Sequence, residues 1–494
     1  MKRATPHSAG SISPPPIKRK IDSTTTSKAV ATFFKPASQR PPENLIWRIV
    51  ENSLVVGRYN PNEKTQDEPK LPVKVAAFDL DDTIIVANTG SKWARSPTSW
   101  KWWDQSIPGR LKQLHEKGYV VVFLSNQGNI SLKDNPKSLQ KDTPSLVNLK
   151  NQITSIFRQL DIPLSFYGAT AQDRFRKPRT GMWDEMLDDL GLQAEDAVDV
   201  DGSFYVGDAA GRAKTDQRNK DHAPSDRHLA ANIGIRFQTP EEFFLGAAPE
   251  PYDHGFDPLR HLERAENSQT PSEVPKDSST AMTFTKNDPQ ELVIFCGSPG
   301  AGKSTFFWDV LEPLGYQRVN QDILKTRDRC IKKAKELLAA GSSVAVDNTN
   351  ADIETRAYWV KLAQEFKVPI RLVRFTASSR LAEHNDAVRA MNLTTMNPEA
   401  RKMLPGIAFR SFLQRLQEPT LKEGFKDIYR VDFQFKGTDE QKKIWSRYWP
   451  YREGKKGGDN EHEGYRKLVS YANDTRHNEK QLLAVGLREF DAVP

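Results

Sequence analysis

The fold is decided by the stretch Leu292-Val293-Ile294-Phe295-Cys296, which runs directly into Gly297-Ser298-Pro299-Gly300-Ala301-Gly302-Lys303-Ser304-Thr305. Five apolar residues in a row predict a strand, and the pattern Gly-x4-Gly-Lys-Ser predicts a phosphate-binding loop that leads into a helix. In such a loop the backbone N–H groups close around phosphate oxygens, helped by the positive potential of the helix N-terminus. The residues expected to bind a nucleotide are Gly297, Gly300, Gly302, Lys303, Ser304 and Thr305.

Two residues of this loop have specific expected roles. Lys303 is expected to reach the outer phosphates of a nucleoside triphosphate, and the Ser304 hydroxyl to coordinate Mg²⁺. The loop itself does not identify the acceptor of the phosphoryl group.

A second motif, Asp79-Leu80-Asp81-Asp82-Thr83, follows the apolar run Val75-Ala76-Ala77-Phe78. Ligands of open α/β sheets bind beyond the carboxyl ends of the strands, so Asp79 and Asp81 are both expected to face that crevice. Asp79 is a candidate nucleophile that would form an aspartyl-phosphate, and Asp81 a candidate general acid and base. We expect both carboxylates to help hold Mg²⁺, which would offset the charge of a phosphate.

Taken alone, an Asp-rich turn is most often a helix cap or a solvated loop, but three later segments favour catalysis. Ser125 and Asn126 follow the strand-like run 120–124 and are expected to contact phosphate oxygens. Lys177 offers a cation for the phosphorylated intermediate. Asp208 follows the strand-like run 204–206 and is a candidate Mg²⁺ ligand.

Polar residues of the other half suggest an acceptor site beside the phosphate-binding loop. Asp322 lies where the next strand would end, and a carboxylate there could orient and deprotonate a hydroxyl group. Asp347, Asn348 and Thr349 follow the apolar run 344–346 and form a second polar cluster, which we expect to bind substrate. Arg389 is a candidate for stabilising charge on the transferring phosphoryl group. The alternatives are a helix-capping Asp and a solvated Arg.

Composition places the chain among soluble proteins of two or three domains. It has 494 residues, of which 28% are charged and 37% hydrophobic, and its formal net charge of +8 favours a polyanionic partner. The two cysteines fit a reducing compartment and allow no disulfide or zinc framework. No secretory signal or membrane span is expected. We predict a monomer and this division: 1–42 disordered basic tail, 43–245 first domain, 246–288 linker, 289–436 second domain, 437–494 extension without an assigned role.

The tail contains two short signals. Pro14-Pro15-Pro16-Ile17-Lys18-Arg19-Lys20 resembles a nuclear import signal, with a solvated basic tail as the alternative. The run from Ser27 to Pro36 resembles a box that binds the sliding clamp, with Val30, Phe33 and Phe34 at its apolar positions. Ser27 stands where that box normally has Gln. We therefore expect a nuclear protein that can bind the clamp.

Between the motifs, short apolar runs alternate with helical patterns, which indicates an α/β protein with parallel sheets. The first motif set resembles the haloacid dehalogenase-type phosphatases. The two halves in this order resemble eukaryotic polynucleotide kinase 3′-phosphatases over about residues 73–435. The stretches that carry this resemblance include Arg176-Lys177-Pro178, Val206 to Arg212, the loop at 297–304, and Val346 to Asn350.

The resemblance implies a haloacid dehalogenase-like phosphatase domain followed by a P-loop kinase domain. It implies removal of 3′-phosphates from DNA ends and ATP-dependent phosphorylation of 5′-hydroxyls, in DNA strand-break repair. It suggests Asp322 as the base for the 5′-hydroxyl and Asp347 for substrate positioning. Residues 1–72 are too short and polar for the forkhead-associated domain of the animal members.

One departure bears on activity: Asp82 occupies a position often held by Gly in phosphatases of this type. Two alternatives therefore stay open. One is an RNA end-healing kinase–phosphatase, which would share both reactions. The other is a kinase or scaffold protein whose phosphatase has decayed at Asp82.

Overall fold

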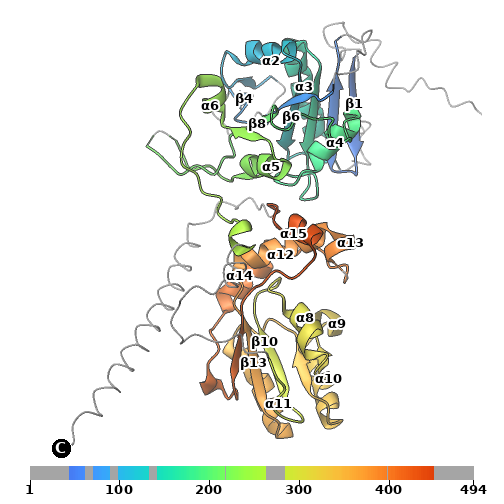
Figure 1. Cartoon of the computed structure of the whole chain (residues 1–494), viewed down its shortest axis with the longest axis vertical. Helices are drawn as coiled ribbons and strands as arrows, with labels where there is room; N and C mark the ends of the chain where they lie inside the picture. The colour runs from blue at the N-terminus through green and yellow to red at the C-terminus, as the bar shows by residue number, and fades with distance from the viewer. Residues whose placement is uncertain are drawn as a thin grey trace, which may run out of the picture.

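The computed structural model describes residues 44–61, 71–88, 98–132, 142–216, 218–262, 284–397 and 399–449. The predicted nuclear import signal, the predicted clamp-binding box with Val30, Phe33 and Phe34, and most of the extension from 437 to 494 lie outside these residues. The described residues form two α/β halves, one above the other in Figure 1.

The first half is built on a seven-stranded sheet in the order β1-β2-β7-β6-β3-β8-β9. The strands from β7 to β9 in this order pair in parallel, as the alternating apolar runs predict. β3 pairs with β6 on one side and with β8 on the other, so the chain continues in opposite directions across the sheet from β3. The carboxyl end of β3 therefore lies at a topological switch point, where open α/β sheets bind ligands. The strands are β3 Lys74–Phe78, β6 Tyr119–Asn126, β7 Leu164–Ala169, β8 Phe204–Val206 and β9 Arg236–Gln238.

An antiparallel hairpin extends this sheet at one edge. It consists of β1, Leu45–Val50, and β2, Leu54–Tyr59, with β2 paired to β7. Arg48 ties the hairpin to the helix α4, Gly181–Leu190, through ion pairs with Glu185 at 2.8 Å and Asp189 at 2.5 Å. The sequence analysis placed residues 43–72 in the first domain without assigning a strand there.

Helices cover both faces of the first sheet. On one face α3, Pro144–Leu160, buries the apolar stripe that its spacing predicts, with Thr143 Oγ1 accepting a hydrogen bond from the Leu146 N–H at its start. The other helices of this half are α2 Ile107–Glu116, α5 Ser225–Ile233 and α6 Pro240–Leu245, and a small hairpin is formed by β4 Ile85–Ala87 and β5 Trp100–Trp102.

The second half contains a five-stranded parallel sheet in the order β11-β12-β10-β13-β14. Its central strand is the apolar run quoted first, and all five of its residues are buried. The strands are β10 Leu292–Cys296, β11 Gln317–Val319, β12 Val344–Val346, β13 Ile370–Phe375 and β14 Ile428–Val431. The α/β class with two mainly parallel sheets is therefore confirmed.

Helical segments surround this second sheet and include a π-helical turn, η2, directly after the phosphate-binding loop. None of the helices in the described ranges combines the length and the apolar character that crossing a membrane requires. The segments are α8 Lys303–Phe306, η2 Phe307–Leu311, α9 Gln321–Leu324, α10 Arg327–Ala339, α11 Ile353–Phe366, α12 Ser379–Met391, α13 Leu393–Met396, α14 Gly406–Arg415, η3 Leu421–Glu423 and α15 Asp439–Trp445.

The two halves meet where α12 and α15 approach α5 (Figure 1). Residues 247–262, part of the predicted linker, contribute Phe256 and Leu262 to an apolar cluster with Leu381 of α12 and Trp445 of α15. The described part of the predicted extension thus packs onto the body of the protein.

Candidate active sites

The first site forms at the carboxyl ends of β3 and β8, where the sequence placed its aspartates. Asp79 is buried, and the Lys177 ammonium group lies 2.6 Å from its Oδ1. Lys177 also donates a hydrogen bond to the Tyr205 hydroxyl at 3.0 Å and lies 2.7 Å from Oδ1 of Asp226. Burial disfavours the charged lysine, but the charges of Asp226 and Asp79 outweigh it and raise the pKa of Lys177. The cation is therefore fixed beside the candidate nucleophile.

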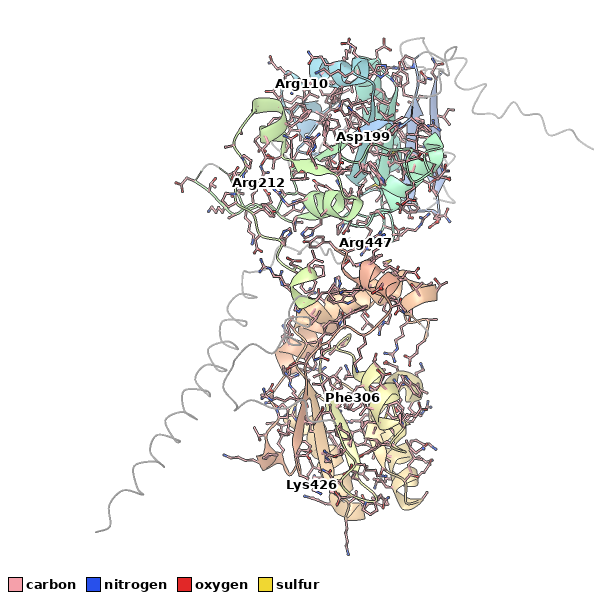
Figure 2. The ribbon with its side chains drawn as sticks, viewed as in Figure 1. Arg110, Asp199, Arg212, Phe306, Lys426 and Arg447 are labelled. Atoms are coloured by element: carbon pink, nitrogen blue, oxygen red, sulfur yellow. The ribbon has the colours of Figure 1, made fainter. Side chains whose placement is uncertain are left out.

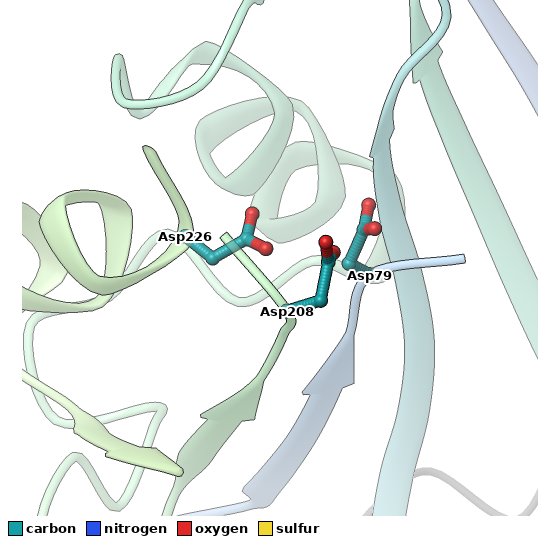
Figure 3. A group of neighbouring side chains, drawn as sticks. All are labelled: Asp79, Asp208 and Asp226. Atoms are coloured by element: carbon teal, nitrogen blue, oxygen red, sulfur yellow. The ribbon is translucent and has the colours of Figure 1, made fainter. Parts of the chain in front are cut away.

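Three carboxylates gather at this site and could hold a metal ion. One oxygen each of Asp79, Asp208 and Asp226 lies within 4.8 Å of the others, and Figure 3 shows the three side chains converging. Burial and the charges of Asp79 and Asp226 raise the pKa of Asp208 well above its usual value, and burial above all raises that of Asp226 to about 6. Oδ1 of Asp226 is buried, and the Lys177 ammonium group is its ion-pair partner. Such a crowded set of oxygens fits a hard divalent cation.

The backbone brings these groups together through two close contacts. The Thr83 hydroxyl accepts a hydrogen bond from the backbone N–H of Asp208 at 3.0 Å, so the motif at 79–83 also fixes the end of β8. Gly207 has no side chain where a Cβ would meet Oδ2 of Asp226 at 2.3 Å. A larger residue at 207 would displace the carboxylate.

Asp81 has a different environment from Asp79. Its Oδ2 accepts a hydrogen bond from Nε2 of Gln127 at 2.7 Å, and it lies outside the three-carboxylate group, although we expected it to be a metal ligand. Burial, then the charge of Asp79, raises the pKa of Asp81 to about 7. A carboxyl group with this pKa can donate a proton near neutral pH and take one back, as a general acid and base must.

Ser125 and Asn126, which were predicted to contact phosphate, are the last two residues of β6 and lie beside Asp81. The Ser125 hydroxyl is buried and accepts a hydrogen bond from Gln127 at 3.0 Å. The Asn126 side chain accepts a hydrogen bond from the backbone N–H of Lys177 at 2.9 Å and donates one to its carbonyl oxygen at 3.3 Å. Asn126 therefore positions the Lys177 backbone.

Asp82 is exposed, and its negative charge contributes to the raised pKa values of Asp81 and Asp208. Its φ of +58° is left-handed, which explains why glycine suits this position, and Asp is among the residues that tolerate that conformation. Its backbone N–H donates to the carbonyl oxygen of Ile85 at 2.8 Å and closes the turn. An aspartate at position 82 is thus compatible with the geometry of the site.

The second site is the phosphate-binding loop at the carboxyl end of β10. Gly300 has a φ of +75°, and a Cβ there would meet the carbonyl oxygen of Ala382 at 2.2 Å, so the loop packs directly on α12. The Lys303 ammonium group donates hydrogen bonds to the carbonyl oxygens of Gly297 at 3.1 Å and Ser298 at 2.6 Å. Burial lowers the pKa of Lys303 to about 8. Thr305, in α8, is exposed.

Asp347 at the end of β12 connects the loop to an arginine. Its Oδ2 accepts hydrogen bonds from the Ser304 hydroxyl at 2.8 Å and from Arg318, whose Nη2 also donates to Ser304 Oγ at 2.8 Å. Asn348 accepts a hydrogen bond from the backbone N–H of Gln321 at 2.9 Å, and the carbonyl oxygen of Thr349 accepts one from Gly297 at 3.2 Å. Asp347, Asn348 and Thr349 therefore organise the loop and the start of α9.

Asp322, the predicted base, lies on α9 with 76% of its side chain exposed. Nη1 of Arg401 lies 3.6 Å from its Oδ2, and Nη2 of Arg401 donates to Ser304 Oγ at 3.2 Å. Arg389, our candidate for charge stabilisation, pairs instead with Asp386 of its own helix at 2.5 Å. Two other arginines lie beside the loop: Arg318 of β11, and Arg401 on the segment between α13 and α14.

Comparison with known proteins identifies the relatives. Residues 74–244 match the family described as polynucleotide kinase 3 phosphatase, and residues 292–419 match an AAA domain family. A bifunctional polynucleotide phosphatase/kinase of Schizosaccharomyces pombe is 39% identical over 405 residues, which cover 82% of this chain and 88% of the relative. The chain belongs to the bifunctional polynucleotide phosphatase/kinase family.

Two further relatives of this family member are named polynucleotide 3′-phosphatases. A polynucleotide 3′-phosphatase of Arabidopsis thaliana is 32% identical over 36% of this chain and 25% of the relative. A polynucleotide 3′-phosphatase of Saccharomyces cerevisiae is 27% identical over 36% of this chain and 91% of the relative. This member of the phosphatase/kinase family carries a polynucleotide 3′-phosphatase and a polynucleotide kinase, with a metal site in the first and a nucleotide site in the second.

Four residues that contact the two sites of this phosphatase/kinase were not assigned a role from the sequence. Gln127 follows two residues that were predicted to contact phosphate, and Asp226 is the second residue of α5, so both had a local signal. Arg318 and Arg401 had none, because a lone arginine in a strand or loop looks the same whether it faces solvent or a phosphate site.

Proposed function

We propose that this protein restores DNA strand breaks to a form that a ligase can seal. In this proposal the phosphatase half removes 3′-phosphates with Mg²⁺, and the kinase half transfers a phosphoryl group from ATP to 5′-hydroxyls. The observation that carries the proposal is the coexistence in one chain of a buried Asp79–Lys177 pair and a phosphate-binding loop beside Asp322. The resemblance of the motifs to DNA-end enzymes and the net charge of +8 support DNA as the substrate.

In the phosphatase reaction Asp79 attacks phosphorus and forms an aspartyl-phosphate while the bond to the 3′-oxygen breaks. Asp81, with its pKa of about 7, gives its proton to that oxygen. Asp81 then takes a proton from water, whose oxygen attacks phosphorus and releases phosphate and free Asp79. Lys177 offsets negative charge on the phosphoryl group. Mg²⁺ bound by Asp79, Asp208 and Asp226 would supply further positive charge there.

In the kinase reaction Asp322 orients the 5′-hydroxyl and accepts its proton as the oxygen attacks the γ-phosphorus of ATP. Lys303 and the loop N–H groups hold the outer phosphates, and ADP leaves. Among the described residues, Arg401 contacts both Ser304 and Asp322. Its guanidinium group is therefore placed to stabilise the negative charge of the phosphoryl group during transfer from ATP to the hydroxyl.

The test uses a gapped DNA duplex with a 3′-phosphate and a 5′-hydroxyl, and two variants of the full chain. Lys303→Ala should lower 5′ phosphorylation by about a hundredfold or more and leave 3′ dephosphorylation near normal. Asp79→Asn should do the reverse. Loss of both activities from either change would contradict two independent sites.

Matched RNA ends complete this experiment. A clear preference for RNA would overturn the DNA assignment and favour RNA end healing. Equal 3′-phosphate removal by wild type and Asp79→Asn would contradict the phosphatase assignment and favour the decayed-phosphatase alternative.

We propose further that the protein acts in the nucleus as a monomer and is recruited by the sliding clamp through Val30, Phe33 and Phe34. Support comes from the basic run 14–20 and from the two adjacent aromatics in a polar segment. A peptide spanning residues 24–40 should bind the clamp, and its Phe33→Ala/Phe34→Ala version should not. Equal binding by the two peptides, or no binding by either, would refute this route of recruitment.

A further inference from the structure

Residues 439–449, here called the joint segment, lie between the two halves. The segment begins with α15, where Thr438 caps the helix, and continues to Trp449. Trp445 is only 2% exposed and packs against Leu381 and Val388 of α12 and Leu262 of the chain between the halves. Arg447, labelled in Figure 2, marks the segment at the boundary of the two halves. Neither proposed reaction uses any of its residues.

One arm of the joint segment reaches the phosphatase. The backbone N–H of Tyr448 donates to Oδ1 of Asn232 on α5 at 2.9 Å, and Nδ2 of Asn232 donates to the Tyr448 carbonyl oxygen at 2.8 Å. The same Nδ2 donates to the carbonyl oxygen of Pro178 at 2.9 Å. Pro178 follows Lys177 directly, so one asparagine links the kinase half to the lysine beside Asp79.

Ring stacking holds this arm in place. The Tyr448 ring lies parallel to the His228 ring, with centroids 3.7 Å apart and an interplanar angle of 8°. His254 stacks on Tyr448 at 5.4 Å, and its Nδ1 lies 3.0 Å from Nε2 of His228. His228 is on the same helix as Asp226, two residues further on. The arm therefore contacts α5 at His228 and Asn232, on the helix that carries Asp226.

The other arm reaches the kinase. Nε1 of Trp445 donates to Oδ1 of Asn385 on α12 at 2.8 Å, and Nδ2 of Asn385 donates to the carbonyl oxygen of Gly300 at 3.0 Å. Gly300 is inside the phosphate-binding loop. Asn385 therefore connects Trp445 of the joint segment to the loop that binds the nucleotide.

We propose that the joint segment positions both active sites at once, with Tyr448 acting through Asn232 on Lys177 and Trp445 acting through Asn385 on Gly300. The two aromatic residues are three positions apart in sequence, and each contacts an asparagine that donates to a backbone carbonyl of a catalytic loop. Asn126 holds the Lys177 backbone from one side, and the Tyr448–Asn232 contact holds the next residue from the other. This inference rests on the two activities described above.

The phosphatase arm is tested in the full chain with Tyr448→Ala, which removes the stacked ring. The kcat for 3′-phosphate removal should fall about threefold to tenfold with little change in KM, because Lys177 acts on the reacting phosphoryl group. Kinase activity should stay at the wild-type level. Tyr448→Phe keeps the ring and the backbone hydrogen bonds and should restore the phosphatase kcat.

The kinase arm is tested with Trp445→Phe, which keeps an aromatic ring in the apolar cluster and removes the N–H donor. The KM for ATP should rise about threefold to tenfold, while the KM for the 5′-hydroxyl strand and the phosphatase kcat stay unchanged. Tyr358→Ala, at a partly exposed tyrosine of α11 in the kinase half, serves as the control and should alter neither activity.

A second pair of variants acts from the other side of each contact. Asn232→Leu should reproduce the effect of Tyr448→Ala, and Asn385→Leu that of Trp445→Phe. Each double variant should be little worse than its single variants, since both changes break the same connection.

The decisive result is that Tyr448→Ala impairs only the phosphatase and Trp445→Phe impairs only the kinase. Equal loss of both activities in Tyr448→Ala, or no loss in either variant, would overturn the proposal. An effect confined to one arm would overturn the shared role of the segment. A wild-type protein that removes no 3′-phosphate would contradict the proposed function instead, so the two failures are distinguishable.

Discussion

Asp82 shows at the scale of a single residue how backbone conformation limits what a site tolerates. Because its φ is +58°, Asp82→Gly should keep the 3′-phosphatase kcat within about twofold of wild type. Asp82→Val places a β-branched residue in a left-handed turn and should destabilise the phosphatase half by about 1–2 kcal/mol. Urea unfolding and phosphatase assays of both variants check this. A Gly variant as impaired as the Val variant would show that the carboxylate itself is required.

A second prediction at this scale concerns His384, which is fully buried beneath Trp445. Burial lowers its pKa to about 3, and its Nδ1 has no hydrogen-bond partner, while Nε2 lies 2.8 Å from the Trp445 carbonyl oxygen. The folded protein therefore keeps this ring neutral at pH values where the unfolded chain, with a pKa near 6.5, binds a proton. The stability that comes from the neutral ring is complete above pH 6.5 and is lost as the pH falls towards 3.

The measurement compares wild type with His384→Gln. Between pH 7 and pH 5 the free energy of unfolding of wild type should fall about 2 kcal/mol more than that of the variant, at about 1.4 kcal/mol per pH unit below 6.5. All other titrating groups are common to both proteins, so the difference reports His384. Parallel pH profiles would contradict a neutral buried ring.

Residues whose chemistry depends on a local motif could be predicted from the sequence. Asp79, Lys177 and Asp208 each follow a recognisable segment, and the structure brings them together at one edge of the sheet. Arg401 could not be predicted, because the contact that gives it a role joins residues far apart in the chain. Arg389 has the right charge on a nearby helix, but it forms an ion pair with Asp386, three residues earlier in the same helix.

At the scale of elements, the segment between α12 and α14 supplies the arginine of the kinase site. Arg401→Ala should lower the kinase kcat about tenfold to a hundredfold, because it removes the cation that contacts Ser304 and Asp322. Arg389→Ala should act mainly on stability, since Arg389 is paired within α12. Steady-state kinetics and thermal unfolding of the two variants separate these roles. A larger kinetic loss in Arg389→Ala would restore Arg389 as the charge-stabilising residue.

Elements with a continuous apolar run were predictable, whereas the hairpin of β1 and β2 was not. Buried parallel strands such as β10 are apolar throughout, which makes them visible in sequence. β1 has one polar residue, Arg48, among five apolar ones, and the burial of its residues does not alternate regularly. Its place is decided by pairing with β2 and by the contact of Arg48 with α4, which are tertiary effects.

At the scale of the whole molecule, the joint segment should make the two halves unfold together. Trp445, Leu262 and Phe256 bury apolar surface between the predicted extension, the predicted linker and α12 of the kinase half, and Tyr448 extends this contact to α5. Because unfolding of one half exposes the shared surface, each half stabilises the other. We therefore expect a single calorimetric transition for wild type and two for Trp445→Ala/Tyr448→Ala.

Ligand binding gives this expectation a sharper form. ATP with Mg²⁺ binds the folded kinase half, so it should raise the single transition of wild type as a whole. In the Trp445→Ala/Tyr448→Ala variant it should raise only one of the two transitions, and the other should stay fixed at every ATP concentration. Tyr358→Ala should behave as wild type. Two transitions in wild type, or a common shift of both in the double variant, would mean that coupling between the halves does not pass through the joint segment.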